Sequence, residues 1–319
     1  MVNEEINSNI VNLGRSTLTE HQSAAADAIL RTLTGQTTHT QCALAGYAGT
    51  GKTYTTQHIA HRLAESGYRL LAVTFTHKAL AVLSQALSGS EAMTADAALG
   101  WRFNWRTQDM QPGGPHKIRG YDAIVVDEAS MIDRRRYDAL VKAAGNTPIL
   151  WIGDPAQLPP VNEPSSPVFD LVQHQERLTE VVRQAEGNPI IELSARLRAC
   201  LEARKAPTLA DLQDLAEGPL CVVSGGPSVI ADYVADATRH GLDCRAVAWR
   251  NRTVDTIARM IHAQLHPPGS EYFAPGDVVT FGSRFAGGDV QVQNDQTGQV
   301  LSARRLAQYG PLSADVYDI

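Results

Sequence analysis

Apolar and polar positions along the first half of the chain alternate between two kinds of segment. Short, nearly continuous apolar runs predict buried strands at residues 41–46, 69–76, 121–130 and 147–155. Longer mixed segments between and before them predict helices at residues 18–33, 52–66, 77–88 and 134–145. Strands that alternate with helices indicate an α/β fold, in which a mostly parallel sheet is covered on both faces.

The second half repeats this alternation more weakly, and its last part has a different sequence pattern. Helices are predicted at residues 188–201, 227–241 and 251–265, with strands at residues 219–226 and 244–250. After the sequence HPPGS, which begins at His266, short strands are predicted at residues 276–283, 289–294 and 298–303. This last part is therefore expected to be rich in β structure.

These changes of pattern predict the domain organisation. The expected parts are a loose leader at residues 1–16, a first domain at residues 17–177, a second at residues 178–266 and a β-rich segment at residues 267–319. Within the first domain, residues 99–120 are rich in Trp, Arg and Gly and have little periodicity. We expect this segment to be a small insertion.

The composition restricts the class of protein but does not identify its function. The chain has 319 residues, a formal net charge of −6, 43% hydrophobic and 19% charged residues, so a globular protein with room for two domains is expected. The charge argues against a general polyanion-coating protein, although a local basic groove can still bind nucleic acid. The four cysteines lie far apart, with no CxxC or Cys/His cluster, which predicts reduced thiols, a cytoplasmic location and no zinc site.

The clearest chemical motif is GYAGTGKT, which follows a predicted strand and opens a predicted helix. That context is what a phosphate-binding loop requires, because backbone N–H groups and the helix N-terminus then face a polyphosphate. Lys52 would reach the β- and γ-phosphates and Thr53 would ligate Mg²⁺. The expected ATP-binding residues of the loop are Gly46, Gly49, Thr50, Gly51, Lys52 and Thr53. A Gly-rich turn without a ligand is the weaker alternative.

Two further motifs follow strands of the same predicted sheet. In VVDEAS, Asp127 would hold Mg²⁺ and Glu128 would orient and deprotonate the attacking water. An acidic strand end facing solvent is the alternative for this pair. In GDPAQLPPV, Asp154 and Gln157 lie in a loop where a Gln can sense the γ-phosphate.

Together these motifs make residues 18–300 resemble a superfamily 1 helicase, specifically the RecD/Dda-like 1B group. LTEHQ resembles the Q motif, GYAGTGKT motif I, TFTHKAL motif Ia, DEAS motif II and GDPAQLPPV motif III. LTEVVRQAEGNPI resembles motif IV, and WRNRTVD resembles a second-lobe segment that contacts DNA. The sequences of motifs III and IV, taken together, are much more specific to this family than the phosphate loop is.

The resemblance implies roles for further residues. Gln22 would read adenine, Asp154 would belong to the ATP site, and Arg183 would be an arginine finger that reaches the γ-phosphate. The implied DNA-binding residues are Thr76, His77, Lys78, Thr94, Pro160, Asn251 and Arg252.

Several of these roles have a structural alternative. Gln22 and Thr19 have capping-box spacing, so Gln22 could simply close the start of its helix. Asn251 could be only a helix N-cap. Arg183 could be a surface arginine, although its sequence context favours the finger.

The remaining DNA assignments also stay open. His77 and Lys78 could form a solvated helix start. A basic cluster could be an exposed helix face rather than a DNA-facing patch; it comprises Arg245, Arg250, Arg252 and Arg259. An aromatic series in the insertion suits either stacking of bases on an exposed β-ribbon or a small hydrophobic cluster; it comprises Trp101, Phe103 and Trp105.

The chain departs from the family pattern in two places. Asp96 stands where motif Ib usually has His, and a carboxylate cannot donate to phosphate as His can. Motifs V and VI are absent, because Thr238-Arg239 lies on the wrong side of the β-rich segment to be motif VI. We therefore expect the chain to end inside the β insertion, with a second lobe that lacks some of its strands.

The resemblance implies a P-loop NTPase with one RecA-like lobe, a partial second RecA-like lobe and the start of an SH3-like β element. The implied function is ATP- and Mg²⁺-dependent 5′-to-3′ translocation on single-stranded DNA with unwinding of 5′-tailed duplexes. The alternatives are a DNA-stimulated ATPase that does not unwind and a non-catalytic nucleotide-binding module. The expected protein is a monomer without a membrane partner, and it acts with replication, recombination or repair proteins.

Overall fold

The computed structural model describes residues 18–87, 89–104, 106–107, 109–180, 189–208, 226–270, 273–281, 285–287, 290–292, 297–302, 304–309 and 314–318. The predicted leader at residues 1–16 lies outside the described residues, as does most of the predicted strand at residues 219–226. The chain divides into two compact units, one made of Met1–Asn188 and Leu197–Lys205, the other of Pro189–Arg196 and Ala206–Ile319. The division falls inside helix α8, Pro189–Glu202.

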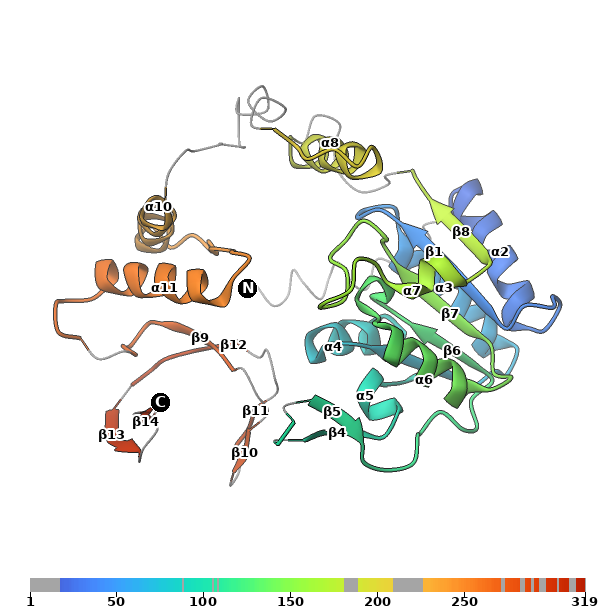
Figure 1. Cartoon of the computed structure of the whole chain (residues 1–319), viewed down its shortest axis with the longest axis horizontal. Helices are drawn as coiled ribbons and strands as arrows, with labels where there is room; N and C mark the ends of the chain where they lie inside the picture. Colours follow the sequence, from blue (N-terminus) through green and yellow to red (C-terminus); the bar gives the residue numbers. More distant parts are fainter. Residues whose placement is uncertain are drawn as a thin grey trace. The chain divides into compact units, whose positions relative to one another are not determined.

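The first unit is an α/β layer structure (Figure 1). Its helices are α2 (Glu20–Leu33), α3 (Lys52–Glu65), α4 (His77–Ala86), α5 (Ala95–Ala98), η1 (Ala129–Met131), α6 (Arg134–Ala144) and α7 (Pro167–Leu171). Its strands are β1 (Gln41–Gly46), β2 (Leu70–Thr74), β3 (Glu91–Thr94), β4 (Trp101–Asn104), β5 (Asp109–Pro112), β6 (Ala123–Val126), β7 (Ile149–Gly153) and β8 (His174–Leu178).

Six of these strands form one sheet in the order β3-β2-β6-β7-β1-β8, and every neighbouring pair is parallel. The predicted α/β fold is therefore confirmed. Because the strands are parallel, the residues that follow β1, β6 and β7 meet at one edge of the sheet. The two edge strands β3 and β8 are additional to the prediction, since their sequences EAMT and HQERL lack a continuous apolar run.

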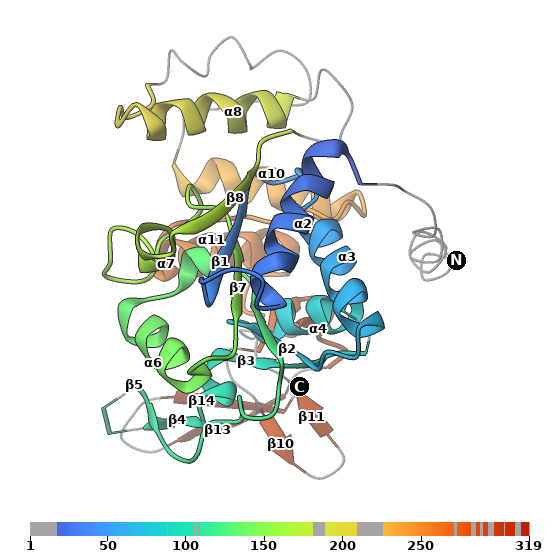
Figure 2. The same cartoon turned by 90° about the vertical axis from the view of Figure 1, so that its right-hand side faces the viewer.

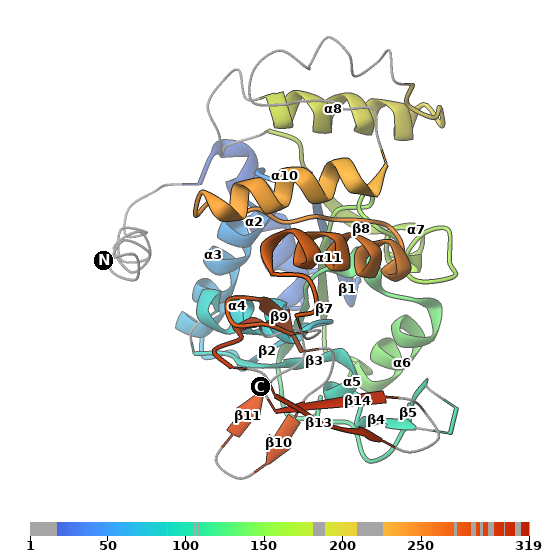
Figure 3. The same ribbon diagram turned by 90° about the vertical axis from the view of Figure 1, so that its left-hand side faces the viewer.

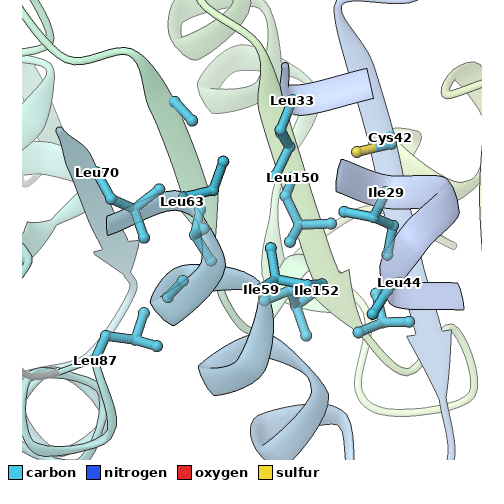
Figure 4. Close-up of a cluster of buried hydrophobic side chains, with 14 of the residues drawn as sticks. Ile29, Leu33, Cys42, Leu44, Ile59, Leu63, Leu70, Leu87, Leu150 and Ile152 are labelled. Carbon is cyan, nitrogen blue, oxygen red and sulfur yellow. The ribbon is translucent and has the colours of Figure 1, made fainter. Parts of the chain in front are cut away.

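The buried core of this unit lies in two layers, one on each face of the sheet. Figure 2 shows α2 and α3 on one side of the sheet and α6 on the other. Successive strand residues alternate between the layers, so Leu44 joins one cluster and Ala43 the other. Figure 4 shows the first cluster, where Ile29 of α2 and Ile59 of α3 lie beside strand residues. This burial on both faces explains why the strands read as continuous apolar runs.

Local sequence determines where several helices begin. Thr19 and Gln22 form a complete capping box at the start of α2. Asp133 caps α6 by accepting a hydrogen bond from Arg136 N at 2.6 Å. Gly67, just after α3, has a φ of +80°, a conformation that commonly ends helices. The predicted helix boundaries in this unit therefore have a physical basis in single residues.

The predicted insertion at residues 99–120 contains an antiparallel hairpin of β4 and β5. Trp101 belongs to the edge of the second core cluster, and the Arg135 guanidinium lies 4.4 Å from the centre of its ring. Phe103, two residues further along the same strand, is exposed. Trp101 therefore fits the hydrophobic-cluster alternative, base stacking on Phe103 stays a prediction, and Trp105 lies outside the described residues.

The second unit contains α10 (Pro227–Arg239) and α11 (Asn251–Leu265) together with small strand pairs. The strands are β9 (Val278–Thr280), β10 (Phe285–Gly287), β11 (Val290–Val292), β12 (Thr297–Gln299), β13 (Arg304–Tyr309) and β14 (Ala314–Asp318). They pair antiparallel as β9 with β12, β10 with β11 and β13 with β14. Figure 3 shows α10 beside α11, where Gln264 donates to Asp232 at 2.7 Å.

The strand predicted at residues 244–250 is wrong. Residues 242–248 have no regular secondary structure, and Val247 and Trp249 are 86% and 85% exposed. A strand of a parallel sheet needs hydrogen-bonding neighbours, and the described residues of this unit contain no parallel strand pair.

No helix within the described ranges is both apolar enough and long enough to span a bilayer.

Candidate active site

The loop between β1 and α3 has the shape of a phosphate cradle that its glycines make possible. Gly51 has a φ of +81°, a conformation that glycine adopts without strain. A Cβ at Gly46 would lie 2.7 Å from Thr50 Oγ1 and 3.1 Å from the Leu178 carbonyl. Both positions therefore require glycine, the first for backbone conformation and the second for close packing.

Lys52 lies over this loop. Its ammonium donates hydrogen bonds to the Gly46 carbonyl at 2.8 Å and to the Tyr47 carbonyl at 3.0 Å. Burial lowers the pKa of Lys52, and three carboxylates act against that shift. In order of decreasing effect they are Asp154, Glu128 and Asp127. The predicted catalytic lysine and the three predicted acidic residues therefore share one electrostatic site.

Asp127 and Glu128 follow β6 directly, at the same edge of the sheet. Asp127 N donates to the Val73 carbonyl at 2.9 Å, and Asp127 Oδ1 accepts a hydrogen bond from Glu128 N at 2.9 Å. Burial raises the pKa of Asp127, while the hydrogen bond from Glu128 N and the charge of Lys52 offset part of the rise. The hydrogen bond from Glu128 N thus fixes the orientation of the Asp127 carboxylate, which interacts with the positive charge of Lys52.

Glu128 has the backbone geometry of a constrained functional residue. Its φ of 55° lies in the left-handed region, which is uncommon for residues other than glycine. Burial, and then the charge of Asp127, raises the pKa of Glu128, whereas Lys52 lowers it. A carboxylate with a raised pKa is a stronger base toward water than an ordinary glutamate.

Asp154 follows β7 and is 1% exposed. Arg198 of α8 donates to both of its oxygens, at 2.9 Å and 2.7 Å, in a bidentate pair. Burial acts to raise the pKa of Asp154, but the hydrogen bonds from Arg198 and Ala156 N outweigh it, so this pKa lies below its ordinary value. Gln157 is exposed in the same loop, and its backbone N donates to the Asp154 carbonyl at 2.9 Å.

Arg198 and Tyr47 are the residues of this site that sequence reasoning missed. The Arg198 guanidinium lies 3.8 Å from the centre of the Tyr47 ring, within the phosphate loop, while it holds Asp154. Arg198 lies 44 residues after Asp154, and no spacing or motif connects the two in the sequence. Only the folded chain brings this second positive group to the loop.

Two buried hydroxyls next to the site have no hydrogen-bond partner within the part of the chain that the structure describes. They are Thr74 Oγ1, at the end of β2, and Ser130 Oγ, two residues after Glu128. A buried hydroxyl without a partner is costly, so groups of this kind are typical of sites that bind a polar ligand.

Gln22 forms the predicted capping box and also supports the loop. Its Oε1 accepts from Thr19 N at 3.1 Å and its Nε2 donates to the Thr50 carbonyl at 3.0 Å, with the side chain buried. Both ends of the amide therefore have protein partners, and the capping alternative is formed. Contact of Gln22 with adenine stays a prediction.

Thr53 is exposed at the first turn of α3, and its hydroxyl is an oxygen donor of the kind that Mg²⁺ takes. The Asp127 carboxylate is a second such donor. These two residues therefore fit the chemistry of a Mg²⁺ site. Arg183 lies outside the described residues, so its role as arginine finger rests on the sequence resemblance.

The predicted DNA-binding residues of the first unit lie at helix starts and in one loop. Thr76 and Thr94 are N-caps, accepting from Ala79 N at 3.1 Å and Ala97 N at 3.3 Å. The side chains of His77 and Lys78 lie outside what the structure describes, and Pro160 is buried. DNA contact at all five positions stays a prediction.

Asp96, which stands at the family's His position, has a structural partner. It forms an ion pair with Arg136 at 3.0 Å, and Arg136 also pairs with Asp133. Whether this position contacts a DNA phosphate stays a prediction.

In the second unit, Asn251 and Arg252 are exposed at the start of α11. The N-cap is Arg250, without a side-chain capping hydrogen bond, so the alternative that Asn251 is only an N-cap is wrong. The residues of the basic cluster are also exposed, and Arg245 pairs with Asp243 at 3.1 Å.

Comparison with known proteins gives consistent relationships. A family model described as an AAA domain matches residues 17–217. The ATP-dependent DNA helicase dda of Enterobacteria phage T4 is 31% identical over 195 residues, covering 57% of this chain and 42% of the phage protein. The uncharacterized protein R530 of Acanthamoeba polyphaga mimivirus is 30% identical over 179 residues, covering 46% of this chain and 35% of its own length. The chain thus spans less than half of these curated relatives.

Among solved structures, the Pif1 helicase of Candida albicans matches 91% of this chain and 70% of its own chain, with a TM-score of 0.48 and 17% identity. AMPPCP-bound DnaA from Aquifex aeolicus matches 64% of this chain and 59% of its own, with a TM-score of 0.33 and 14% identity.

Proposed function

Because the chain belongs to the AAA domain family and is a superfamily 1B helicase-like protein with a RecA-like NTPase fold, we propose that it is an ATP-driven 5′-to-3′ motor on single-stranded DNA. The observation that carries the proposal is the shared site of Lys52, Asp127 and Glu128 at one edge of the parallel sheet. A module that only bound nucleotide would not need a half-buried carboxylate with a raised pKa beside the phosphate lysine.

The proposed nucleotide position follows from the loop. The γ-phosphate replaces the Gly46 and Tyr47 carbonyls as the partner of Lys52, and backbone N–H groups of residues 49–53 face the phosphates. Thr53 and Asp127 hold Mg²⁺, which when bound neutralises charge on the β- and γ-phosphates. The free energy of the new contacts offsets the loss of the two lysine–carbonyl hydrogen bonds.

Hydrolysis then uses the groups that follow β6 and β7. Glu128 orients a water and takes its proton, for which its raised pKa is suited. Gln157 senses the γ-phosphate from the loop after β7, and Arg183 stabilises the charge that develops on it. Arg198 acts as a positioning residue, because its bidentate contact fixes the loop of Asp154 and Gln157.

The proposed DNA contacts lie on both units. Thr76, His77, Lys78, Thr94 and Pro160 would follow the strand on the first unit, with Asn251 and Arg252 on the second. The name of the phage T4 relative, an ATP-dependent DNA helicase, supports DNA as the polymer. We further propose that the protein acts in the cytoplasm as a monomer, together with replication, recombination or repair proteins.

A strand-displacement assay tests this function. The full chain should separate a duplex with a 5′ single-stranded tail in the presence of ATP and Mg²⁺, and should leave the matching 3′-tailed duplex intact. Glu128→Gln should abolish displacement while ATP binding persists, because a missing general base costs roughly 10²- to 10⁴-fold in rate.

Displacement of only the 3′-tailed duplex would overturn the direction. DNA-stimulated ATP hydrolysis without displacement of either duplex would support instead an ATPase that remodels a complex without unwinding. Absence of both would contradict the motor itself.

A further inference from the structure

We propose that the second unit contains a binding site for a divalent transition-metal ion, of which Zn²⁺ is the representative, formed by His262, His266 and Asp277. The site is separate from the nucleotide site and does not depend on the proposed function. The sequence contains no CxxC or Cys/His cluster, so sequence reasoning predicted no zinc site. Folding nevertheless brings together a group whose ligand atoms all lie within 4.8 Å of one another.

His262 lies in the last turn of α11, and His266 is the C-cap residue that follows the helix. They are four residues apart, so their side chains project from the same side of the helix, with ring centres 4.5 Å apart. Two histidines at this helical spacing are a recurrent arrangement for gripping one metal ion. The side chains of His262 and His266 are 21% and 17% exposed, so they are partly removed from water.

Asp277 supplies the third group from the loop before β9. One of its oxygens lies 3.0 Å from His262 Nδ1 and the other lies 2.8 Å from His266 Nε2. The loop holds the carboxylate in place, since Asp277 Oδ2 accepts from Ala274 N and Asp277 O accepts from Val300 N, both at 2.8 Å. Such hydrogen bonds fix the direction of a metal-binding carboxylate.

The donor set determines the class of ion. Two imidazoles and one carboxylate suit Zn²⁺ and related transition metals, whereas Mg²⁺ and Ca²⁺ prefer oxygen donors alone. With metal–ligand bonds of about 2.0–2.1 Å, tetrahedral donors lie roughly 3.3 Å apart. The observed separations of 2.8 Å and 3.0 Å therefore need to expand by only a few tenths of an ångström to admit an ion.

The surroundings of the three side chains also leave space for further ligands of an ion. All three residues line a cavity of about 630 Å³, from which water can complete the coordination.

Within the unit, the ion would join two elements that are distant in sequence. It would tie the C-terminal end of α11 to the loop that enters β9 (Figure 3). Binding to the folded unit but not to the unfolded chain stabilises the folded state by mass action. We therefore assign the site a structural role in holding the β-rich segment against the helix.

Titration with Co²⁺ tests the proposal, because Co²⁺ reports its ligands in its visible spectrum. The full chain, purified without a polyhistidine tag and freed of metal with EDTA, should bind one Co²⁺ per chain. The spectrum should show four-coordinate d–d bands without the near-ultraviolet band of thiolate ligation, which excludes exposed Cys244 as the binding residue. Zn²⁺ should displace the bound Co²⁺, and excess Mg²⁺ should not.

Variants identify the ligands. His266→Ala and Asp277→Asn should each weaken Co²⁺ binding by at least the roughly 10- to 100-fold that follows from loss of an outer-shell partner. His240→Ala is the matched control, because His240 is exposed and pairs with Asp236, and the described residues offer no third ligand there. It should bind Co²⁺ as the wild type does.

Thermal unfolding gives a second readout on the same proteins. Zn²⁺ should raise the Tm of the wild type and of His240→Ala, but not that of Asp277→Asn. If His266→Ala fails to fold, His262→Gln replaces it as the ligand variant. Failure of the wild type to bind Co²⁺, or equal binding by the ligand variants, would overturn the proposal and leave a hydrogen-bonded cluster.

Discussion

Two tryptophans show how differently the two units of this chain are built. Trp151, in β7 of the first unit, is 0% exposed, whereas Trp249, before α11 of the second unit, is 85% exposed. Trp151 lies between neighbouring strands β1 and β6 and packs against Tyr137 of α6, with ring centres 5.3 Å apart. Trp249 belongs to a segment without strand partners among the described residues.

The difference shows that helices and parallel strands depend on different contacts. α10 and α11 form where their sequences predict them, because a helix makes its backbone hydrogen bonds within itself. A parallel strand obtains its hydrogen bonds from its neighbours, so an apolar sequence such as residues 244–250 is not sufficient alone. The first unit has six mutually supporting strands, and its proposed nucleotide site lies where three of them end.

The largest effect that tests this comparison is on stability. Trp151→Ala should lower the free energy of unfolding of the first unit by about 3–5 kcal/mol, because it empties a buried site between strands and helix. Trp249→Ala is the matched exchange in the second unit and should change stability by less than about 0.5 kcal/mol. Urea unfolding measures both, and a large loss in Trp249→Ala would mean that this residue is packed in solution.

Next in size is the removal of Arg198. Arg198→Ala leaves the buried Asp154 carboxylate without its bidentate partner, which should cost roughly 3 kcal/mol and loosen the loop that carries Gln157. Arg198→Lys keeps the charge but loses the paired geometry, so it should recover only part of the stability. The measurements are the affinity for ATP and the free energy of unfolding of both variants. Equal values for Arg198→Ala and Arg198→Lys would show that the bidentate contact is unimportant.

A smaller loss should follow from crowding the phosphate loop. Gly46→Ala places a Cβ 2.7 Å from Thr50 Oγ1 and should cost about 1–3 kcal/mol, with weaker ATP binding. At Gly114, in the insertion, an added Cβ would meet nothing nearer than 3.9 Å. Gly114→Ala should therefore leave ATP binding unchanged in equilibrium dialysis, and a Gly46→Ala variant with normal ATP affinity would contradict the close packing.

The smallest effect is a pH dependence. The pKa of Asp154 lies below its ordinary value in the folded chain, so its contribution to stability is present above the unfolded pKa of about 3.9 and is lost as pH falls through the folded pKa. The difference in unfolding free energy between wild type and Asp154→Asn should therefore be greatest near neutral pH and shrink in acid. A difference that grows as pH falls would have the wrong sign for this account.

The parts of the fold that could be predicted are those specified by neighbouring residues. The phosphate loop, the helix starts at Thr19 and Asp133 and the apolar runs of β1, β6 and β7 are local signals. The edge strand β8 alternates half-buried and exposed positions without an apolar run, and it becomes a strand because β1 is beside it. A local sequence pattern does not specify which strand will pair with a segment of this kind.

The same reasoning applies to the sites. Lys52 and Glu128 belong to motifs with fixed spacing, so their meeting at the sheet edge could be anticipated. Arg198 reaches Asp154 and Tyr47 only because α8 lies beside the loop, and Asp277 reaches His262 only because the chain turns back after α11. Contacts between elements far apart in sequence are what the folded chain adds.

The central claim is that the site around Lys52 hydrolyses ATP in response to single-stranded DNA, and steady-state ATP hydrolysis with and without oligonucleotide tests it most directly. The account predicts that DNA stimulates the wild type and that Lys52→Ala lowers the stimulated rate by about 10²- to 10³-fold. Lys142→Ala, an exposed lysine of α6, should behave as wild type. DNA-stimulated hydrolysis that survives in Lys52→Ala would contradict the account.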